Sequence, residues 1–267
     1  MTASPAPTTT DTAVSYALDN GIATLTLDRP GRYNTLTSEV IAAMSTQLAA
    51  IAASSEVRVV IIAATGKAFS TGHDLKEMNA HRDEAFYRRL LADCSRMMQA
   101  IVALPQPVIA QVQGIATAAG CQLVASCDLA VAAASARFAT NGIANGLYCA
   151  TPSVALSRVV QRKHALEMLL TGDFIDAARA AEIGLVNHVV DDAELASATR
   201  ALAQRIAEKS QYAVRLGKAS FYRQVNQGLD SAYRGTSEEL VCNLLAADGV
   251  EGLNAFIEKR APKWQDR

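Results

Sequence analysis

Short apolar runs recur loosely along this sequence, and several of them are followed by a loop of small residues. Residues 57–63, 108–113 and 128–133 are three such runs, rich in Val, Ile and Ala, which is typical of strands buried on both faces of a sheet. Strand, small-residue loop and helix recur at a spacing of about 50 residues, which favours stacked β-β-α units over one long sheet. The chain is therefore expected to be an α/β protein.

Local signals predict the elements around these runs. Residues 13–18 and 22–27 alternate in polarity around the turn dipeptide Asn20-Gly21, which predicts a β-hairpin. Apolar residues spaced by three or four positions predict a helix that begins after Thr37 as its N-cap. A second helix over 84–104 is expected to end before Pro105, and a short helix over 121–126 precedes the third strand.

The C-terminal part of the chain is predicted to be mostly helical. A helix capped by Asp176 leads to a strand over 185–190, and the chain is helical again from Asp192. Breaks are expected at three glycines, namely Gly217, Gly228 and Gly249. We therefore divide the chain into a disordered tail over 1–12, a core over 13–200 and a helical oligomerisation region over 201–267.

The balance of charged and apolar residues excludes some classes of protein. Lys and Arg total 25 and Asp and Glu total 26, so a net charge of -1 provides no overall field that would attract nucleic acid. Hydrophobic residues make up 50% and charged residues 19%, and this charged fraction lies below the ~25% typical of soluble domains. Other subunits are therefore expected to cover part of the surface.

Cysteines and the N-terminus bear on the compartment. Five cysteines include no Cys-x-x-Cys pair and the histidines do not cluster, so neither a disulfide framework nor a metal site is expected. Residues 1–11 contain no basic residue and no apolar run, which argues against a secretory or organellar leader and predicts a cytoplasmic location. The most apolar stretch, 115–136, is interrupted by Gly120, Gln122 and Asp128, so no membrane span is expected.

Two loops of small residues, 65–76 and 113–122, are the candidate functional site. Small residues let backbone N–H groups approach a ligand closely, and the start of a helix adds partial positive charge. Two such N–H groups would form an oxyanion hole. The alternative is that Gly72 and Gly120 serve only tight turns, and the side chain of His73 alone is more typical of a surface residue than of a base.

The first loop contains Lys-Ala-Phe-x-x-Gly-x-Asp-Leu-Lys and resembles a motif of the crotonase (enoyl-CoA hydratase/isomerase) superfamily. Other segments are similar to further motifs of this family in the same order, and the resemblance covers about residues 13–267. These segments are Arg29-Pro30 with Asn34-Thr35-Leu36, Pro107-Val108-Ile109-Ala110 with Gly114, Cys127-Asp128-Leu129-Ala130, Leu169-Leu170-Thr171-Gly172, Gly184-Leu185-Val186-Asn187 and Phe256-Ile257-Glu258-Lys259-Arg260.

This resemblance implies an acyl-CoA site. The backbone N–H groups of His73 and Ala119 would bind the thioester oxygen and stabilise the enolate formed there. Coenzyme A would enter as part of the substrate and not as a separate cofactor. The residues assigned to it are Thr71, Leu75 and Lys76, with Asp74 left open between an acid/base and a helix cap, and Phe256 and Lys259 from a neighbouring subunit, with a solvated helix as the alternative for these last two.

The sequence departs from the resemblance at both acid/base positions. Family hydratases place two glutamates over the substrate, and here Gln122 and Gly142 stand at those positions. Ordinary hydration is expected to be slow, because each positioned acid or base contributes about 10²–10⁴ in rate. Candidate replacements are Asn141, Tyr148 and Cys149, although a small buried hydrophobe is the commoner role for a residue such as Cys149.

We therefore expect a crotonase (ClpP/crotonase-like) spiral of β-β-α units with a C-terminal helical trimerisation region, assembled as a homotrimer or a dimer of trimers. The expected activity is nominally of the enoyl-CoA hydratase class, a lyase of fatty acid metabolism. Acyl-CoA decarboxylation or hydrolysis is one alternative, since loss of CO₂ forms the enolate without a base. A non-catalytic acyl-CoA-binding protein is the other.

Overall fold

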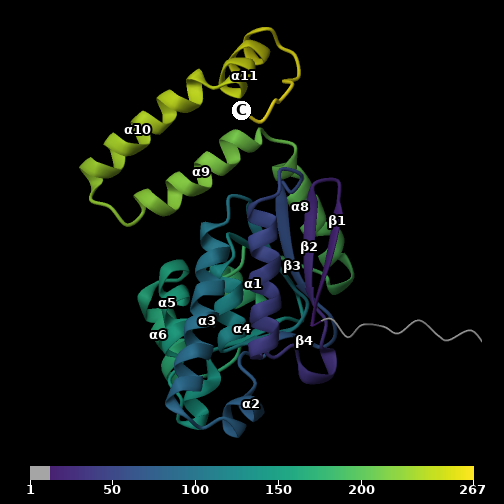
Figure 1. The fold of residues 1–267 in the computed structure, drawn as a ribbon, viewed down its shortest axis with the longest axis vertical. Helices are drawn as coiled ribbons and strands as arrows, with labels where there is room; N and C mark the ends of the chain where they lie inside the picture. The colour runs from purple at the N-terminus through teal and green to yellow at the C-terminus, as the bar shows by residue number, and fades with distance from the viewer. Residues whose placement is uncertain (1–12) are drawn as a thin grey trace, which may run out of the picture.

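Two β-sheets form the centre of the computed structural model, which describes residues 13–267 (Figure 1). The tail expected over 1–12 lies outside the described residues. The larger sheet has six strands in the order β1-β2-β3-β5-β7-β10, and the smaller has four in the order β4-β6-β8-β9. The larger contains β1 (Val14–Asp19), β2 (Ile22–Leu27), β3 (Val59–Ala64), β5 (Val108–Val112), β7 (Leu129–Ala133) and β10 (His188–Val190); the smaller contains β4 (Ala68–Ser70), β6 (Ile115–Thr117), β8 (Arg137–Ala139) and β9 (Ile175–Asp176).

The larger sheet is buried on both faces, as the apolar runs predict. On β3, Val60 and Ile62 pack into the core on one face, and Val59 and Ile61 pack into a smaller core on the other. This division follows from the period of two along a strand. Helices α1 (Ser38–Ala52), α3 (Glu84–Ala103) and α4 (Ala119–Ser126) supply side chains to the first core, and α8 (Leu195–Ala207) to the second (Figure 1).

The chain alternates between the two sheets, which confirms the expected β-β-α units. β3, β5 and β7 are each followed by a short strand of the smaller sheet and then by a helix. The remaining helices are α2 (Leu75–Ala80), α5 (Ala150–Val159), α6 (Arg162–Thr171) and α7 (Ala177–Glu182), with 3₁₀ turns at Pro30–Arg32, Asn141–Asn145 and Asp192–Glu194. Short strands therefore carry the chain from the large sheet to each helix.

Several local predictions are confirmed and several are wrong. Thr37 caps α1, since its hydroxyl oxygen accepts a hydrogen bond of 3.2 Å from the Val40 amide. The segments 65–76 and 113–122 are not plain loops, because they contain β4 and β6 and the start of α2 and α4. Strands of three residues are too short to show an alternating pattern in the sequence.

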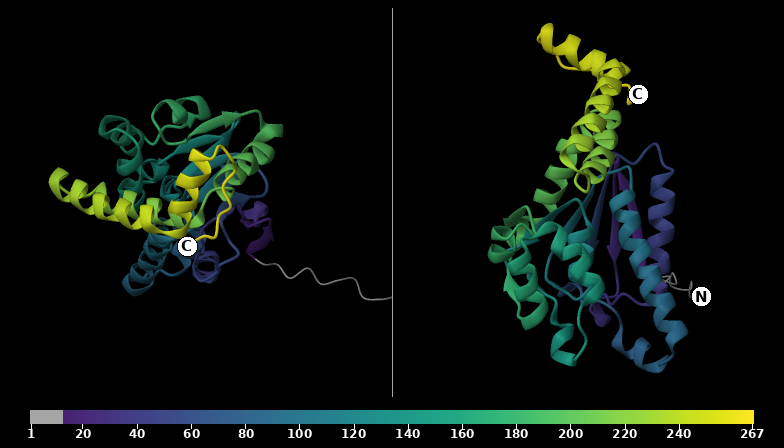
Figure 2. Two further views of the ribbon diagram at one scale, coloured as in Figure 1. Left: turned by 90° about the horizontal axis from the view of Figure 1, so that it is seen from above. Right: turned by 90° about the vertical axis from the view of Figure 1, so that its left-hand side faces the viewer.

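Helices α9 (Gln211–Gln224), α10 (Leu229–Leu245) and α11 (Ala247–Ile257) form an arm that extends beyond the spiral (Figure 2). Gly228 precedes α10 as predicted, but Gly217 and Gly249 lie inside helices and the second break falls at Ala246. The expected boundary between residues 200 and 201 falls inside α8, which packs on the larger sheet. Within 13–267 no single helix is long and apolar enough to cross a membrane; only the pair α10 and α11, bent by 71°, passes such a test of length and composition.

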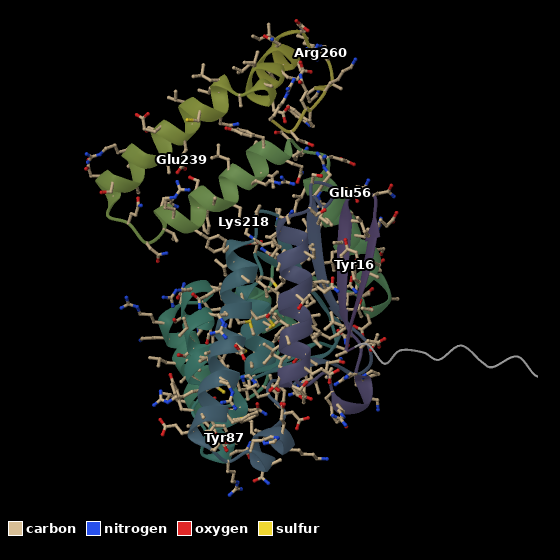
Figure 3. The ribbon with its side chains drawn as sticks, viewed as in Figure 1. Tyr16, Glu56, Tyr87, Lys218, Glu239 and Arg260 are labelled. Carbon is tan, nitrogen blue, oxygen red and sulfur yellow. The ribbon has the colours of Figure 1, made fainter. Side chains whose placement is uncertain are left out.

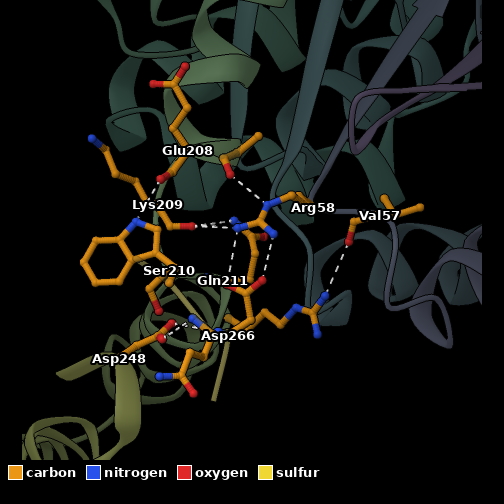
Figure 4. Close-up of polar contacts among 12 residues, drawn as sticks. Val57, Arg58, Glu208, Lys209, Ser210, Gln211, Asp248 and Asp266 are labelled. Carbon is orange, nitrogen blue, oxygen red and sulfur yellow. Dashed lines mark hydrogen bonds and ion pairs between the residues drawn. The ribbon is translucent and has the colours of Figure 1, made fainter. Parts of the chain in front are cut away.

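Two polar clusters attach the arm to the spiral. Lys218 lies on α9 (Figure 3). It donates a 2.7 Å hydrogen bond to the carboxylate of Asp128, which also accepts one of 2.8 Å from the Tyr222 hydroxyl. Near the hinge between α8 and α9, the guanidinium of Arg58 pairs with Asp266 at 2.7 Å (Figure 4). The same Asp266 accepts a hydrogen bond of 2.9 Å from the Gln211 amide.

Candidate active site

A cavity of about 1160 Å³ lies where the two small-residue loops meet. Its walls bring together residues from four distant segments of the chain, around 29–39, 71–78, 115–119 and 141–152. Predicted site residues that line it are Thr71, His73, Asp74, Leu75, Lys76, Ala119 and Gly142, together with the candidate replacements Asn141, Tyr148 and Cys149. Gln122, Phe256 and Lys259 are not among its lining residues.

Gly72 brings the two loops into close approach. Its φ of +82° is favourable only for glycine, and a Cβ there would lie 2.9 Å from the Ala119 amide nitrogen. The Gly72 carbonyl accepts a 2.8 Å hydrogen bond from the Leu36 amide, so the trans peptide directs the following His73 N–H away from Leu36. Within residues 13–267 this N–H donates to no protein acceptor.

The second amide lies at the N-terminus of α4. Ala119 is the first residue of this helix, so its N–H has no intrahelical acceptor, and no other acceptor is found for it in the described chain. The preceding Ala118 has φ 49° and ψ -119°, a strained conformation for alanine that is held by its hydrogen bond of 3.0 Å to the Ala139 carbonyl. Two residues whose N–H groups have no protein acceptor in the described chain, one of them at the positive end of a helix, thus line the same cavity.

The imidazole of His73 makes a contact of its own, with the backbone of Leu36. Its Nδ1 lies 3.3 Å from the Leu36 carbonyl oxygen, which requires the proton on Nδ1. Burial lowers the pKa of His73, an effect only partly opposed by the Leu36 carbonyl and by Glu77. The lowered pKa favours the neutral ring at pH 7, and the hydrogen bond to Leu36 leaves the backbone N–H of His73 as its free donor in the described chain.

Asp74 acts as the N-cap of α2. Its Oδ1 accepts hydrogen bonds of 2.8 Å and 3.2 Å from the amides of Lys76 and Glu77, and its Oδ2 accepts one from the Thr35 hydroxyl. Burial disfavours its charge, but these donors outweigh burial and lower the pKa of Asp74. Of the two roles left open by the sequence, the geometry favours the cap.

Gly142, at the second of the two acid/base positions, has no room for a side chain. A Cβ on Gly142 would lie 2.5 Å from the Leu147 carbonyl oxygen and 2.9 Å from the Cys149 sulfur, because the loop over 142–149 folds back on it. The Gly142 amide donates to the Cys149 thiol, whose pKa is nevertheless raised by burial. Gln122 is buried on α4, and its Oε1 finds no hydrogen-bond partner among the described residues.

Phe256 and Lys259 lie far from this cavity within one chain. Figure 1 places α2, which lines the cavity, and α11 at opposite ends of the molecule. Sequence reasoning missed part of the wall: Arg32, the Arg29–Glu39 ion pair of 2.7 Å, and the apolar side chains of Met78, Leu91 and Phe174. Arg29 belongs to the Arg-Pro motif and Arg32 lies two residues after it, which offered a signal for these two. Glu39 and the apolar residues lie outside that motif, and the apolar ones look like ordinary core residues in the sequence.

A spiral of β-β-α units with two unpaired backbone amides facing a cavity defines a protein of the crotonase class. The sequence pattern of the family described as enoyl-CoA hydratase/isomerase matches residues 17–267. The chain belongs to this family of the crotonase superfamily, and within it to the branch of enoyl-CoA hydratase domain-containing protein 3, which the sequence motifs resemble.

Relatives and solved structures agree with this assignment. The mitochondrial enoyl-CoA hydratase domain-containing protein 3 of Xenopus laevis is 46% identical over 92% of this chain and 84% of its own length. A crystal structure of an enoyl-CoA hydratase from Mycobacterium smegmatis is 49% identical with a TM-score of 0.93, covering 94% of this chain and 98% of that one. The crystal structure of human enoyl Coenzyme A hydratase domain-containing protein 3 is 46% identical with a TM-score of 0.90, and the match covers 94% of this chain and 100% of that one. The expected fold class is confirmed.

The expected cytoplasmic location is wrong by the same comparison. The relatives from Xenopus laevis, Homo sapiens and Rattus norvegicus are all named as mitochondrial proteins. The prediction rested on the composition of residues 1–11, which lie outside the described residues, and so short a stretch does not determine a compartment.

Proposed function

We propose that this protein is an acyl-CoA-binding enzyme that stabilises a thioester enolate with the backbone N–H groups of His73 and Ala119. The observation that carries the proposal is the pair of amides without protein acceptors, one at the positive end of a helix, beside a cavity of about 1160 Å³. Preorganised donors of this kind lower the barrier where negative charge develops on oxygen, and one donor is worth about 10²–10³ in rate.

Coenzyme A is proposed to lie along α2 as part of the substrate, with no separate cofactor. Thr71, Leu75 and Lys76 would line its pantetheine and adenine, while Asp74 holds the start of α2 in place. Lys76 offers a positive charge to a phosphate. A local positive charge would thus bind the anionic coenzyme A although the net charge of the chain is only -1.

A neighbouring subunit is proposed to complete the site. Phe256 and Lys259 cannot reach the cavity of their own chain, but Phe256 is 85% exposed at the end of an arm rich in exposed apolar side chains. Such an apolar surface favours assembly as a trimer or a dimer of trimers. Lys259 would then face a coenzyme A phosphate of the adjacent chain.

The reaction itself is proposed to differ from ordinary hydration. Gln122 has an amide that is not basic at pH 7, and Gly142 has no side chain and no room for one. Decarboxylation or hydrolysis of an acyl-CoA is the alternative reaction, with the cavity-lining residues Asn141, Tyr148 and Cys149 as candidate replacements for the glutamates. A non-catalytic acyl-CoA binder would keep the amide pair without turnover.

Turnover of crotonyl-CoA separates these possibilities. We expect a hydration rate far below that of a hydratase with both glutamates; a rate within about tenfold of such an enzyme would contradict the proposed role of Gln122 and Gly142. Thermal unfolding with millimolar acyl-CoA tests binding itself, because a ligand of the folded state must raise the melting temperature. No rise would overturn the proposed function.

A further inference from the structure

Asn34 is a buried polar residue that uses its whole side chain for hydrogen bonds to the backbone. Its Oδ1 accepts one of 2.8 Å from the Arg29 amide, and its Nδ2 donates to the carbonyls of Thr65 and Ala68, both at 2.8 Å. It is 2% exposed. The side chain therefore joins the turn after β2 to the connection between β3 and β4.

The segment over 33–36, which contains Asn34, hydrogen-bonds to the loop that carries the His73 amide. Tyr33 accepts a 3.2 Å hydrogen bond from the Thr71 amide, and Leu36 donates one of 2.8 Å to the Gly72 carbonyl. The second of these bonds orients the Gly72–His73 peptide, and with it the His73 N–H. Asn34 lies between the two contacts in the chain.

The backbone of this segment is not in a conformation it would adopt unaided. Tyr33 and Asn34 have φ of 52° each, in the left-handed region that asparagine tolerates better than most residues. Backbone hydrogen bonds such as the one of 3.1 Å from the Asn34 amide to the Arg29 carbonyl close the turn, and the three side-chain hydrogen bonds of Asn34 tie it to the connection between β3 and β4. Asn34 itself is absent from the cavity walls, so it does not meet a ligand.

We propose that Asn34 is the positioning residue of the oxyanion hole: it fixes the segment over 33–36, which in turn aims the His73 N–H at the thioester oxygen. This inference rests on the proposed function. It assigns to Asn34 a larger effect on the thioester group than on the coenzyme A portion. The segment over 33–36 also contacts Thr71 and Asp74, but only the hydrogen bond from Leu36 orients the Gly72–His73 peptide.

The test compares two variants by infrared spectroscopy of bound butyryl-CoA labelled with ¹³C at its carbonyl. Asn34→Gly removes the side chain but tolerates the positive φ, and Asn34→Asp keeps the acceptor for Arg29 while losing both donated hydrogen bonds. The unmodified protein is expected to lower the carbonyl stretching frequency. In both variants this shift shrinks, and the preference for butyryl-CoA over free CoA falls by roughly tenfold, the value of one hydrogen bond.

Gln106→Glu is the matched control. Gln106 is also a fully buried amide whose Nε2 donates to two backbone carbonyls, of Ile51 and Ser54, but it lies outside the cavity. This variant should keep the carbonyl shift and the preference for the thioester. A folded Asn34 variant with an unchanged carbonyl shift, or one that weakens butyryl-CoA and free CoA equally, would overturn the inference. No shift in the unmodified protein would overturn the proposed function and this inference with it.

Discussion

The spiral and the arm differ in how closely their residues pack and in how much apolar surface they expose. In the spiral, loops are packed so closely that a single methyl group on Gly120 would fall on the Ser70 carbonyl, and the backbone itself forms the candidate site. In the arm, Leu245 is 77% and Phe256 is 85% exposed. The spiral therefore completes its own core, whereas the arm leaves apolar side chains exposed that the proposed contact with another chain would cover.

The attachment of the arm to the spiral follows from this difference. Because α9 to α11 bury little apolar surface, polar groups hold them in place, at Asp128–Lys218 and at Arg58–Asp266. The side chains of the first pair are only 7% and 14% exposed, whereas those of the second pair are 27% and 36% exposed. Substitutions in the two regions should therefore act by different mechanisms.

Lys218→Met should have the largest effect, a loss of about 3–5 kcal/mol in the free energy of unfolding, because it leaves the Asp128 carboxylate buried without its cation. Denaturant unfolding measures it. Lys163→Met on the exposed surface of α6 is the control and should change stability little. A loss as small for Lys218→Met as for this control would mean that the arm is held by something other than the buried pair.

Gly120→Ala should cost about 3 kcal/mol, since its Cβ collides with backbone atoms of Ser70 that cannot move independently. Gly235→Ala in the arm makes the same chemical change in the middle of α10, where no atom lies within 4 Å of the new methyl group. That variant should gain about 0.5–1 kcal/mol from helix propensity. Equal effects at the two sites would break the contrast between spiral and arm.

Leu245→Ser should weaken the proposed assembly, reducing the free energy of association by about 2 kcal/mol for each Leu245 side chain buried between subunits. The stability of the isolated chain should change little, because Leu245 is 77% exposed there. Sedimentation velocity over a range of protein concentrations measures this. The dissociation should shift to higher concentration without loss of helical circular dichroism. If Leu245→Ser unfolds the chain at every concentration, the arm has a core of its own.

Asp266→Asn should have the smallest effect, about 1 kcal/mol, because the pair with Arg58 is partly open to solvent. Burial disfavours the charge of Asp266, but the Gln211 amide and the Arg58 guanidinium outweigh it and lower the pKa. The stabilisation is therefore present above the ordinary pKa of 3.8 and is lost as pH falls through the lower folded value. Thermal unfolding measures this effect. The difference in melting temperature between the unmodified protein and Asp266→Asn should shrink as the pH is lowered through this range.

The sequence predicts elements whose cause is local and misses those whose cause is tertiary. The hairpin at Asn20-Gly21 and the cap at Thr37 follow from neighbouring residues, and both are present. Gly217 and Gly249 look like helix breaks, yet both lie within helices, because glycine in a helix lowers stability without forcing a break.

The candidate site divides in the same way. Motifs point to Gly72, His73 and Ala119, and the structure brings the segments that carry them together. They do not reveal that the Leu147 carbonyl closes the space beside Gly142, nor that Asn34 ties two distant turns, since both depend on contacts between segments far apart in the chain. A substitution visible in sequence thus acquires its physical meaning only from the fold.

A crystal structure with a bound acyl-CoA would show directly whether the two backbone amides hold the thioester oxygen. We expect the thioester oxygen at about 2.7–3.1 Å from the backbone nitrogens of both His73 and Ala119, with the coenzyme A chain along α2. A thioester bound elsewhere, or an oxygen in the cavity that contacts neither amide, would contradict it.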